Sequence, residues 1–160
     1  MKNNLEFSAG VLNVVLATFL FIETIFIGFM AFACLLMSFT IFFIAAIPLT
    51  LILAFICVIS LGATVAHVAS GAGSIVASLK GGKASQVFSI ISVVADLAVI
   101  PANVFSFGYF IYAFFFNVAE GETDGIGLGI ALIVFCAIAA ILATASLIIN
   151  LIALSRKKQN

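Results

Sequence analysis

Residues Lys80-Gly81-Gly82-Lys83 form a short basic stretch with a long apolar segment on either side, and the layout of the whole chain follows from this pattern. Adjacent glycines suit a tight turn, and the two lysines belong in water or among lipid headgroups. Outward from this stretch, no lysine or arginine occurs in 3–79 or in 84–155. We therefore expect both segments to lie in a membrane, with the basic stretch joining two helices as a hairpin.

The composition excludes a water-soluble globular protein. Of the 160 residues, 66% are hydrophobic and 8% are charged, whereas soluble domains carry about 25% charged residues. The net charge is zero, and no basic stripe is present that would neutralise the phosphates of a nucleic acid. The expected partner of this surface is the lipid bilayer, and nucleic acid is not expected to bind.

The two apolar segments divide into four expected spans. An acidic, glycine-rich run at 119–125 interrupts the second segment, and a turn near 38–48, where Pro48 suits a helix start, divides the first. The expected spans are 7–40, 48–79, 84–118 and 126–154. The sequence thus predicts an all-α fold: one transmembrane domain over 1–160, built as an antiparallel, up-down four-helix bundle.

The basic residues predict the orientation in the membrane. They are Lys2, Lys80, Lys83, Arg156, Lys157 and Lys158. The positive-inside rule places both termini and the basic stretch in the cytoplasm, with the acidic run outside. We expect a multi-pass protein of the plasma membrane in a bacterial host. In a eukaryotic host, the ending resembles a dilysine retrieval signal of the endoplasmic reticulum.

Three ionisable residues, Glu23, His67 and Asp96, lie deep within the expected spans. His67 and Asp96 are equally far in sequence from the centre of the basic stretch, so an antiparallel hairpin brings them to the same depth. Glu23 reaches a comparable depth if the first hairpin turns near Ala45. An aspartate within a span costs ~2.5–3.5 kcal/mol on insertion scales, so such residues usually face inward and pair.

Two interpretations of these three residues stay open at this point. In the first, they are a hydrogen-bonded clasp that holds the helices in register, with the acids neutral. In the second, they are a relay for protons or cations, because histidine changes charge near neutral pH.

A ladder of small residues occupies every fourth position of the second span. Its members are Gly62, Ala66, Ser70, Ser74 and Ser78. Small residues let helix backbones approach closely in lipid. We expect this face to pack against another helix, either within the chain or in an oligomer.

The sequence shows no nucleophile–base pair, phosphate-binding loop or set of metal ligands, so we predict a non-enzyme without cofactor or metal. The leading interpretation is a structural, scaffolding or accessory subunit that contacts other membrane proteins or copies of itself. The alternative is a small, oligomeric channel or transporter for protons or cations, lined by the three ionisable residues.

The four spans, the basic hairpin and the ending Leu151-Ile152-Ala153-Leu154-Ser155-Arg156-Lys157-Lys158 resemble small, uncharacterised four-helix membrane proteins of bacteria. The layout is also similar to MARVEL-type tetraspan proteins, in which an acidic residue recurs in the third span, the position of Asp96. The resemblance covers the whole chain and concerns layout. It implies a role in organising membrane domains.

Overall fold

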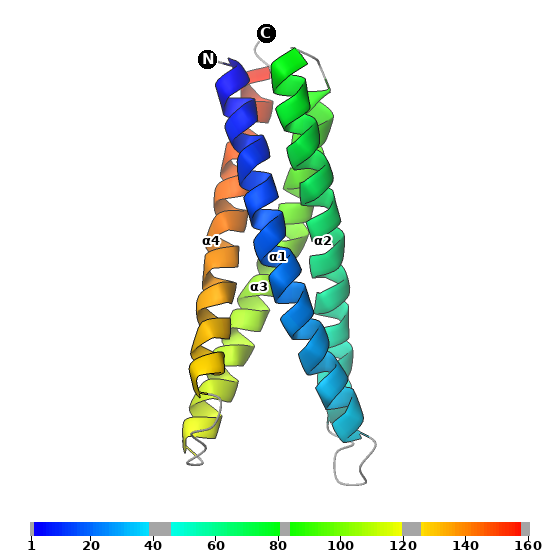
Figure 1. The fold of residues 1–160 in the computed structure, drawn as a ribbon, viewed down its shortest axis with the longest axis vertical. Helices are drawn as coiled ribbons and strands as arrows, with labels where there is room; N and C mark the ends of the chain where they lie inside the picture. Colours follow the sequence, from blue (N-terminus) through cyan, green and yellow to red (C-terminus); the bar gives the residue numbers. More distant parts are fainter. Residues whose placement is uncertain (1, 39–45, 81–83, 120–125, 158–160) are drawn as a thin grey trace.

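The computed structural model describes residues 2–38, 46–80, 84–119 and 126–157. These residues form four helices and no strand: α1 (Lys2–Ser38), α2 (Ala46–Lys80), α3 (Ser85–Ala119) and α4 (Ile126–Lys157). The helices run alternately up and down along one long axis (Figure 1). The prediction of an all-α, antiparallel four-helix bundle is confirmed.

The helices begin and end close to the expected spans, with α1 starting at Lys2 rather than at residue 7. The helix α3 continues through Pro101, which faces outward. The expected turns fall mostly in 39–45, 81–83 and 120–125, which lie outside the described residues.

All four helices are long and apolar enough to cross a membrane. The candidate spans in the described part of the chain are Asn4–Leu36, Ile47–Lys80, Ser85–Phe115 and Gly129–Arg156, with lengths of 28 to 34 residues. A span needs ~20 residues, so each helix exceeds the thickness of the hydrocarbon core. Within lipid a helix satisfies its own backbone polar groups, which is why these apolar segments become helices. Length and composition are thus those of a multi-pass membrane protein.

The bundle has two unlike ends (Figure 1). The start of α1, the end of α2, the start of α3 and the end of α4 meet at one end, together with both chain termini. Packing is most extensive between α1 and α2 and between α3 and α4, and less so between these two pairs. At the other end the two pairs diverge, so the molecule has the outline of an inverted V.

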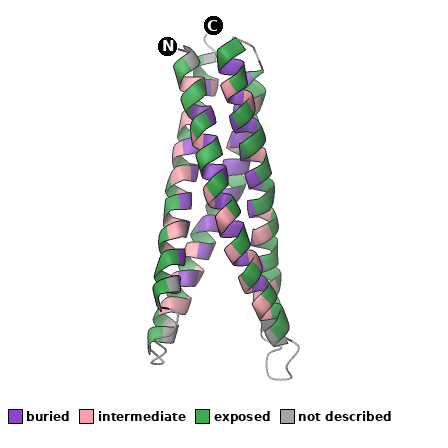
Figure 2. Cartoon of the chain, viewed as in Figure 1, coloured by how far each residue is buried: buried purple, intermediate pink, exposed green. Residues whose placement is uncertain are grey.

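Each helix turns one seam toward the others. In α2 the seam residues recur at alternating steps of three and four: Leu53, Ile56, Ser60, Ala63, His67, Ser70, Ser74 and Ala77. The seam of α3 is Ser89, Ser92, Asp96, Val99, Asn103, Ser106 and Phe110, and that of α4 is Leu132, Cys136, Ala139, Ala143, Ser146, Asn150 and Ala153. Such spacing is typical of helices that pack at a shallow, left-handed angle. Figure 2 shows the buried residues on the inward sides of the helices.

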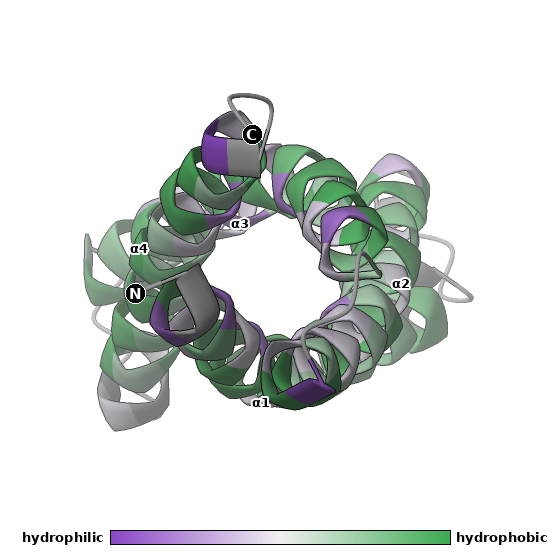
Figure 3. Cartoon of the chain, turned by 90° about the horizontal axis from the view of Figure 1, so that it is seen from above, coloured by the Kyte–Doolittle hydropathy of each residue, from purple (hydrophilic) through white to green (hydrophobic). Residues whose placement is uncertain are grey.

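The outside of the bundle is apolar and bulky, while small and polar side chains line much of its interior. Phe29, Phe55 and Leu79 are 70%, 67% and 76% exposed. Seen along the bundle, hydrophobic residues predominate around the outside (Figure 3). This distribution is the reverse of a soluble bundle and suits a surface solvated by lipid.

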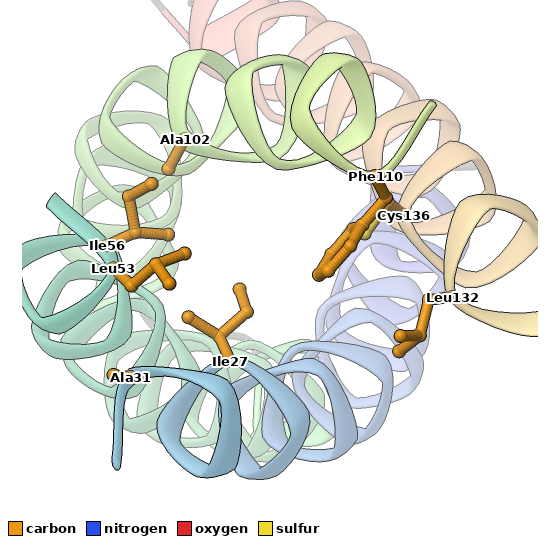
Figure 4. Close-up of a cluster of buried hydrophobic side chains, with 8 residues drawn as sticks. All are labelled: Ile27, Ala31, Leu53, Ile56, Ala102, Phe110, Leu132 and Cys136. Carbon is orange, nitrogen blue, oxygen red and sulfur yellow. The ribbon is translucent and has the colours of Figure 1, made fainter. Parts of the chain in front are cut away.

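Two clusters of buried apolar side chains lie along the axis. The first, here called the apolar layer, consists of Leu16, Leu20, Ala63, Ala95, Val99 and Ala143. The second lies nearer the diverging end, and its side chains project inward from all four helices (Figure 4): Ile27, Ala31, Leu53, Ile56, Ala102, Phe110, Leu132 and Cys136. We call the part of the bundle between the apolar layer and the chain termini the terminal half. The part on the other side of the apolar layer is the distal half.

The helices α1 and α2 come closest at two glycines in the terminal half. A Cβ atom built on Gly71 would lie 2.8 Å from the carbonyl oxygen of Gly10, and one built on Gly10 would lie 2.8 Å from that of Gly71. Real Cβ atoms essentially never approach other atoms so closely. Glycine is therefore required at both positions for this backbone contact.

Candidate functional site: a buried polar line

The centre of the site is the pair His67 and Asp96, both completely buried. The hairpin of α2 and α3 brings Nε2 of His67 to 3.2 Å from Oδ1 of Asp96. The two atoms are not aligned as a hydrogen bond, and neither has another hydrogen-bond partner among the described residues. The sequence-based expectation that these two residues lie at the same depth agrees with this placement.

Ser146 of α4 connects this pair to the other helices. Its Oγ lies 2.8 Å from Oδ2 of Asp96 and 2.8 Å from Oδ1 of Asn13 in α1. Nδ2 of Asn150 lies 3.2 Å from the same Oγ and 3.2 Å from Oδ1 of Asn13. The Ser146 hydroxyl is thus surrounded by three polar side chains.

A second set of hydrogen bonds leads from Asn13 across the bundle. Nδ2 of Asn13 donates to Oγ of Ser92 at 2.7 Å, and Ser92 donates to Oγ of Ser70 at 2.7 Å. The Ser70 hydroxyl in turn donates to the backbone carbonyl of His67 at 3.4 Å. Side chains of all four helices therefore share one buried polar network. Nearer the chain termini, Ser85 donates to Oε1 of Glu6 at 3.1 Å.

Glu23 lies elsewhere, in a second polar cluster. It is 3% exposed, and Sγ of Cys136 lies 3.4 Å from its Oε1. With the Asn103 amide oriented so that its nitrogen faces the carboxylate, Nδ2 lies 3.1 and 3.0 Å from the two Glu23 oxygens. Asn103 is two helical turns beyond Asp96 in α3, a rise of ~10 Å.

The expectation that Glu23 shares the depth of His67 and Asp96 is therefore wrong. It assumed a turn near Ala45, but α1 ends at Ser38 and α2 begins at Ala46. The midpoint between these two helix ends lies before Ala45 in the sequence. The α2 residue at the same depth as Glu23 is therefore not His67 but a residue closer to the start of α2.

The predicted ladder does not form one face. Gly62 is exposed, with no atom within 4 Å of a built Cβ, and Ala66 is half-buried. Ser70, Ser74 and Ser78 are buried. Four residues exceed one helical turn by ~40°, so a ladder of fourth residues winds around the helix. Its first members face outward, and only its last three face the interior.

Several buried polar atoms on the seams have no hydrogen-bond partner among the described residues. They are Ser60 Oγ, His67 Nδ1, His67 Nε2, Ser74 Oγ, Asp96 Oδ1, Ser106 Oγ and Asn150 Oδ1. Each such group costs ~1–3 kcal/mol when it stays unpaired. The hydroxyls of Ser60, Ser74 and Ser106 lie on the seams to either side of the bonded network. We call the network, the Glu23 cluster and these hydroxyls together the polar line.

Sequence reasoning missed four members of the network: Asn13, Ser92, Ser146 and Asn150. A signal for them was present in the third helix, where Ser89, Ser92, Asp96, Asn103 and Ser106 all fit alternating steps of three and four. For metals, the described residues contain no group of three His, Cys, Asp or Glu side chains that could hold an ion.

Four long apolar helices fit a small tetraspan layout. No protein-family model matches the chain, and no curated protein or solved structure matches it significantly. Its function must therefore be inferred from its own side chains.

Proposed function

We propose that this protein conducts protons across a membrane along its buried polar line, with Asp96 and His67 as the central proton-binding pair. The observation that carries this proposal is the surroundings of Ser146. Its single hydroxyl proton faces two acceptor oxygens, Oδ1 of Asn13 and Oδ2 of Asp96, both at 2.8 Å. One hydroxyl proton cannot fully serve both acceptors.

A proton on Asp96 resolves this conflict. A neutral Asp96 donates to Oγ of Ser146, which then donates to Asn13, and every contact is a hydrogen bond. An ionised Asp96 accepts a hydrogen bond from the Ser146 hydroxyl, and Oδ1 of Asn13 still accepts a hydrogen bond from the Asn150 amide at 3.2 Å. The Ser146 hydroxyl therefore has an acceptor in both protonation states of Asp96, as a relay requires.

His67 is placed to exchange this proton. Its Nε2 lies 3.2 Å from Oδ1 of Asp96, and both of its ring nitrogens are buried without a hydrogen-bond partner among the described residues. Imidazole gains and loses a proton near neutral pH. A small rotation of the ring would align Nε2 with the carboxyl oxygen.

A purely structural clasp accounts for only part of the line. The hydrogen bonds of Asn13, Ser92 and Ser146 hold helices together. The hydroxyls of Ser60, Ser74 and Ser106 have no hydrogen-bond partner in the described part of the chain, so they do not hold helices together. A dry interior would favour apolar residues at those positions. A hydroxyl group both donates and accepts a hydrogen bond, so hydroxyl groups along the axis can pass a proton from one hydrogen bond to the next.

The spacing of the network favours a proton over a larger ion. In the terminal half, the polar side chains of Asn13, Ser70, Ser92 and Ser146 lie within 2.7–2.8 Å of their neighbours. A hydrated cation does not fit between groups that are already in contact, whereas a proton needs no such space to exchange between hydrogen-bonded groups.

Proton flux in reconstituted vesicles tests this function. The protein is reconstituted with a pH-sensitive dye inside the vesicles, and a potassium diffusion potential drives protons. We expect flux above that of empty vesicles, and a fall of about tenfold or more in Asp96→Asn. The Asn amide still donates to Ser146, so the network and the fold are kept while the carboxyl group that would carry the proton is lost.

A matched control uses the neighbouring hydroxyl in α4. Thr144 is exposed, and its hydroxyl donates within its own helix, to the carbonyl of Ala140. Thr144→Ala should conduct like the parent protein, whereas Ser146→Ala should conduct less. Flux equal to empty vesicles, or unchanged flux in Asp96→Asn, would rule out the proposal.

We also propose that both termini face the cytoplasm. In support, Lys80 and Arg156 lie at the terminal end of the bundle, where both chain termini meet (Figure 1). Single cysteines at Gly82 and Thr123, in a background without native cysteines, should react with an impermeant reagent from opposite sides. Reaction from the same side would contradict the proposed topology.

A second candidate function, as a scaffolding or accessory subunit, is favoured by a groove on the outside of the bundle. The groove lies between α2 and α3, with a volume of about 440 Å³. Its floor is small: Gly62, Ala63, Ala66, Ala95 and Ala98. Another helix can approach such a floor closely, and we propose that this helix is the same α2 of a second copy.

Cross-linking tests this assembly. In a twofold dimer, Gly62 of one copy lies near Gly62 of the other. Gly62→Cys should therefore form a disulfide-linked dimer in vesicles, while Ile141→Cys, exposed on α4, should not. Monomer in both variants, or equal cross-linking in both, would exclude the dimer.

A further inference from the structure

We infer that Leu20 and Val99 form a hydrophobic gate in the polar line, between the Asp96 network and the Glu23 cluster. The inference rests on the proposed proton conduction. It explains how a polar line that crosses most of the bundle is kept from leaking.

The order of residues along two helices places these side chains between polar groups. In α1, Leu16 and Leu20 separate Asn13 from Glu23, and all four are at most 3% exposed. In α3, Val99 separates Asp96 from Asn103, and all three are completely buried. Two seams therefore change from polar to apolar and back to polar.

The apolar layer interrupts the path of a proton. Asp96 and Asn103 are two helical turns apart, ~10 Å along the axis, while a hydrogen bond spans ~3 Å. The helices α2 and α4 contribute only Ala63 and Ala143 to the layer, so Leu16 and Leu20 of α1 and Val99 of α3 supply its bulk. A constriction lined by such side chains excludes water, and apolar constrictions gate channels by dewetting.

The two residues belong to different helix pairs. Leu20 is on α1, which packs mainly on α2, and Val99 is on α3, which packs mainly on α4. The pairs diverge toward the far end of the distal half (Figure 1). A further separation of the pairs would draw Leu20 away from Val99 and let water connect the two polar clusters.

Val99→Thr tests the gate with almost no change of shape. The substitution adds a hydroxyl to the layer, so we expect proton flux in vesicles to rise about tenfold over the parent protein. Leu20→Asn, of similar size, should act in the same direction. The matched control is Val104→Thr in the same helix, where the side chain is exposed to lipid and flux should stay unchanged.

The double variant Val99→Thr, Asp96→Asn distinguishes a gate from a leak. Loss of the raised flux in the double variant supports the gate, and flux that stays high without Asp96 overturns it. Parent-level flux in both Val99→Thr and Leu20→Asn overturns the gate and leaves proton conduction intact. Flux equal to empty vesicles in the parent and in every variant overturns the conduction on which the gate depends. If Leu20→Asn does not fold, the nearly isosteric Val99→Thr decides alone.

Discussion

The terminal and distal halves of the bundle use the same helices but hold together differently. In the terminal half, the interior is polar and the helices are joined through Asn13, Ser92 and Ser146. In the distal half the Glu23 cluster lies next to a larger apolar cluster, and the helix pairs diverge (Figures 1 and 4). Lipid tails are as apolar as leucine, so apolar contact between helices brings no hydrophobic gain in a bilayer. Polar contacts and close backbone approach therefore decide where the helices stay together.

The largest expected effect on stability comes from replacing one of two glycines of α1 that both face α2. A Cβ at Gly10 would lie 2.8 Å from the carbonyl oxygen of Gly71, whereas the nearest atom to a Cβ at Gly28 is Sγ of Cys57 at 3.4 Å. Overpacking costs ~1–3 kcal/mol, so Gly10→Ala should lower stability by this amount. Gly28→Ala should be neutral or gain up to ~1 kcal/mol, since alanine favours a helix.

Thermal unfolding in a mild detergent measures this difference. Gly10→Ala should unfold at a clearly lower temperature than the parent, and Gly28→Ala at the same or a higher one. Equal effects of the two substitutions would show that α1 and α2 pack with the same tightness in both halves.

A smaller effect is expected from two completely buried serines, one in each half. Ser146 contacts Asn13 and Asp96, whereas the hydroxyl of Ser106 has no partner among the described residues. Ser146→Ala should destabilise the protein by ~1–2 kcal/mol, because it removes hydrogen bonds and leaves buried acceptors unpaired. Ser106→Ala should be neutral or slightly stabilising in the same unfolding assay. A larger loss in Ser106→Ala would contradict the contrast between the halves.

The smallest effect concerns geometry and requires no change in stability. Spin labels on exposed positions of α1 and α4 measure the separation of the two helices in each half. We expect a broader distance distribution for Leu36 with Ile130, in the distal half, than for Val11 with Ile152, in the terminal half. Similar widths for both pairs would mean that the halves are equally rigid.

The number of helices and the shared depth of His67 and Asp96 could be predicted, for a physical reason. Charges mark where an apolar chain leaves the membrane, and the four-residue basic stretch leaves little freedom in how α2 and α3 align. The connection between α1 and α2 carries no such marker, so the depth of Glu23 was predicted incorrectly.

Two further features were not predicted from the sequence, for different reasons. The partners Ser92 and Ser146 follow from seams with alternating steps of three and four, which a ladder of fourth residues such as Gly62 and Ala66 does not reveal. The divergence of the distal half has no sequence signal, because an apolar side chain such as Ile27 suits lipid and a helix neighbour equally well.

Synthesis from the N-terminus also gives the polar network an order of assembly, because its members become available one helix at a time. Asn13 and His67 are synthesised before Asp96, so the aspartate arrives where a polar neighbour is already present. Its insertion alone would cost ~2.5–3.5 kcal/mol. The hydroxyl that serves its other oxygen, Ser146, arrives only with the last helix. A chain that stops after α3 would leave the Asp96 carboxyl group in lipid without its hydrogen bond to Ser146. We therefore expect entry of α4 to commit the protein to its native packing.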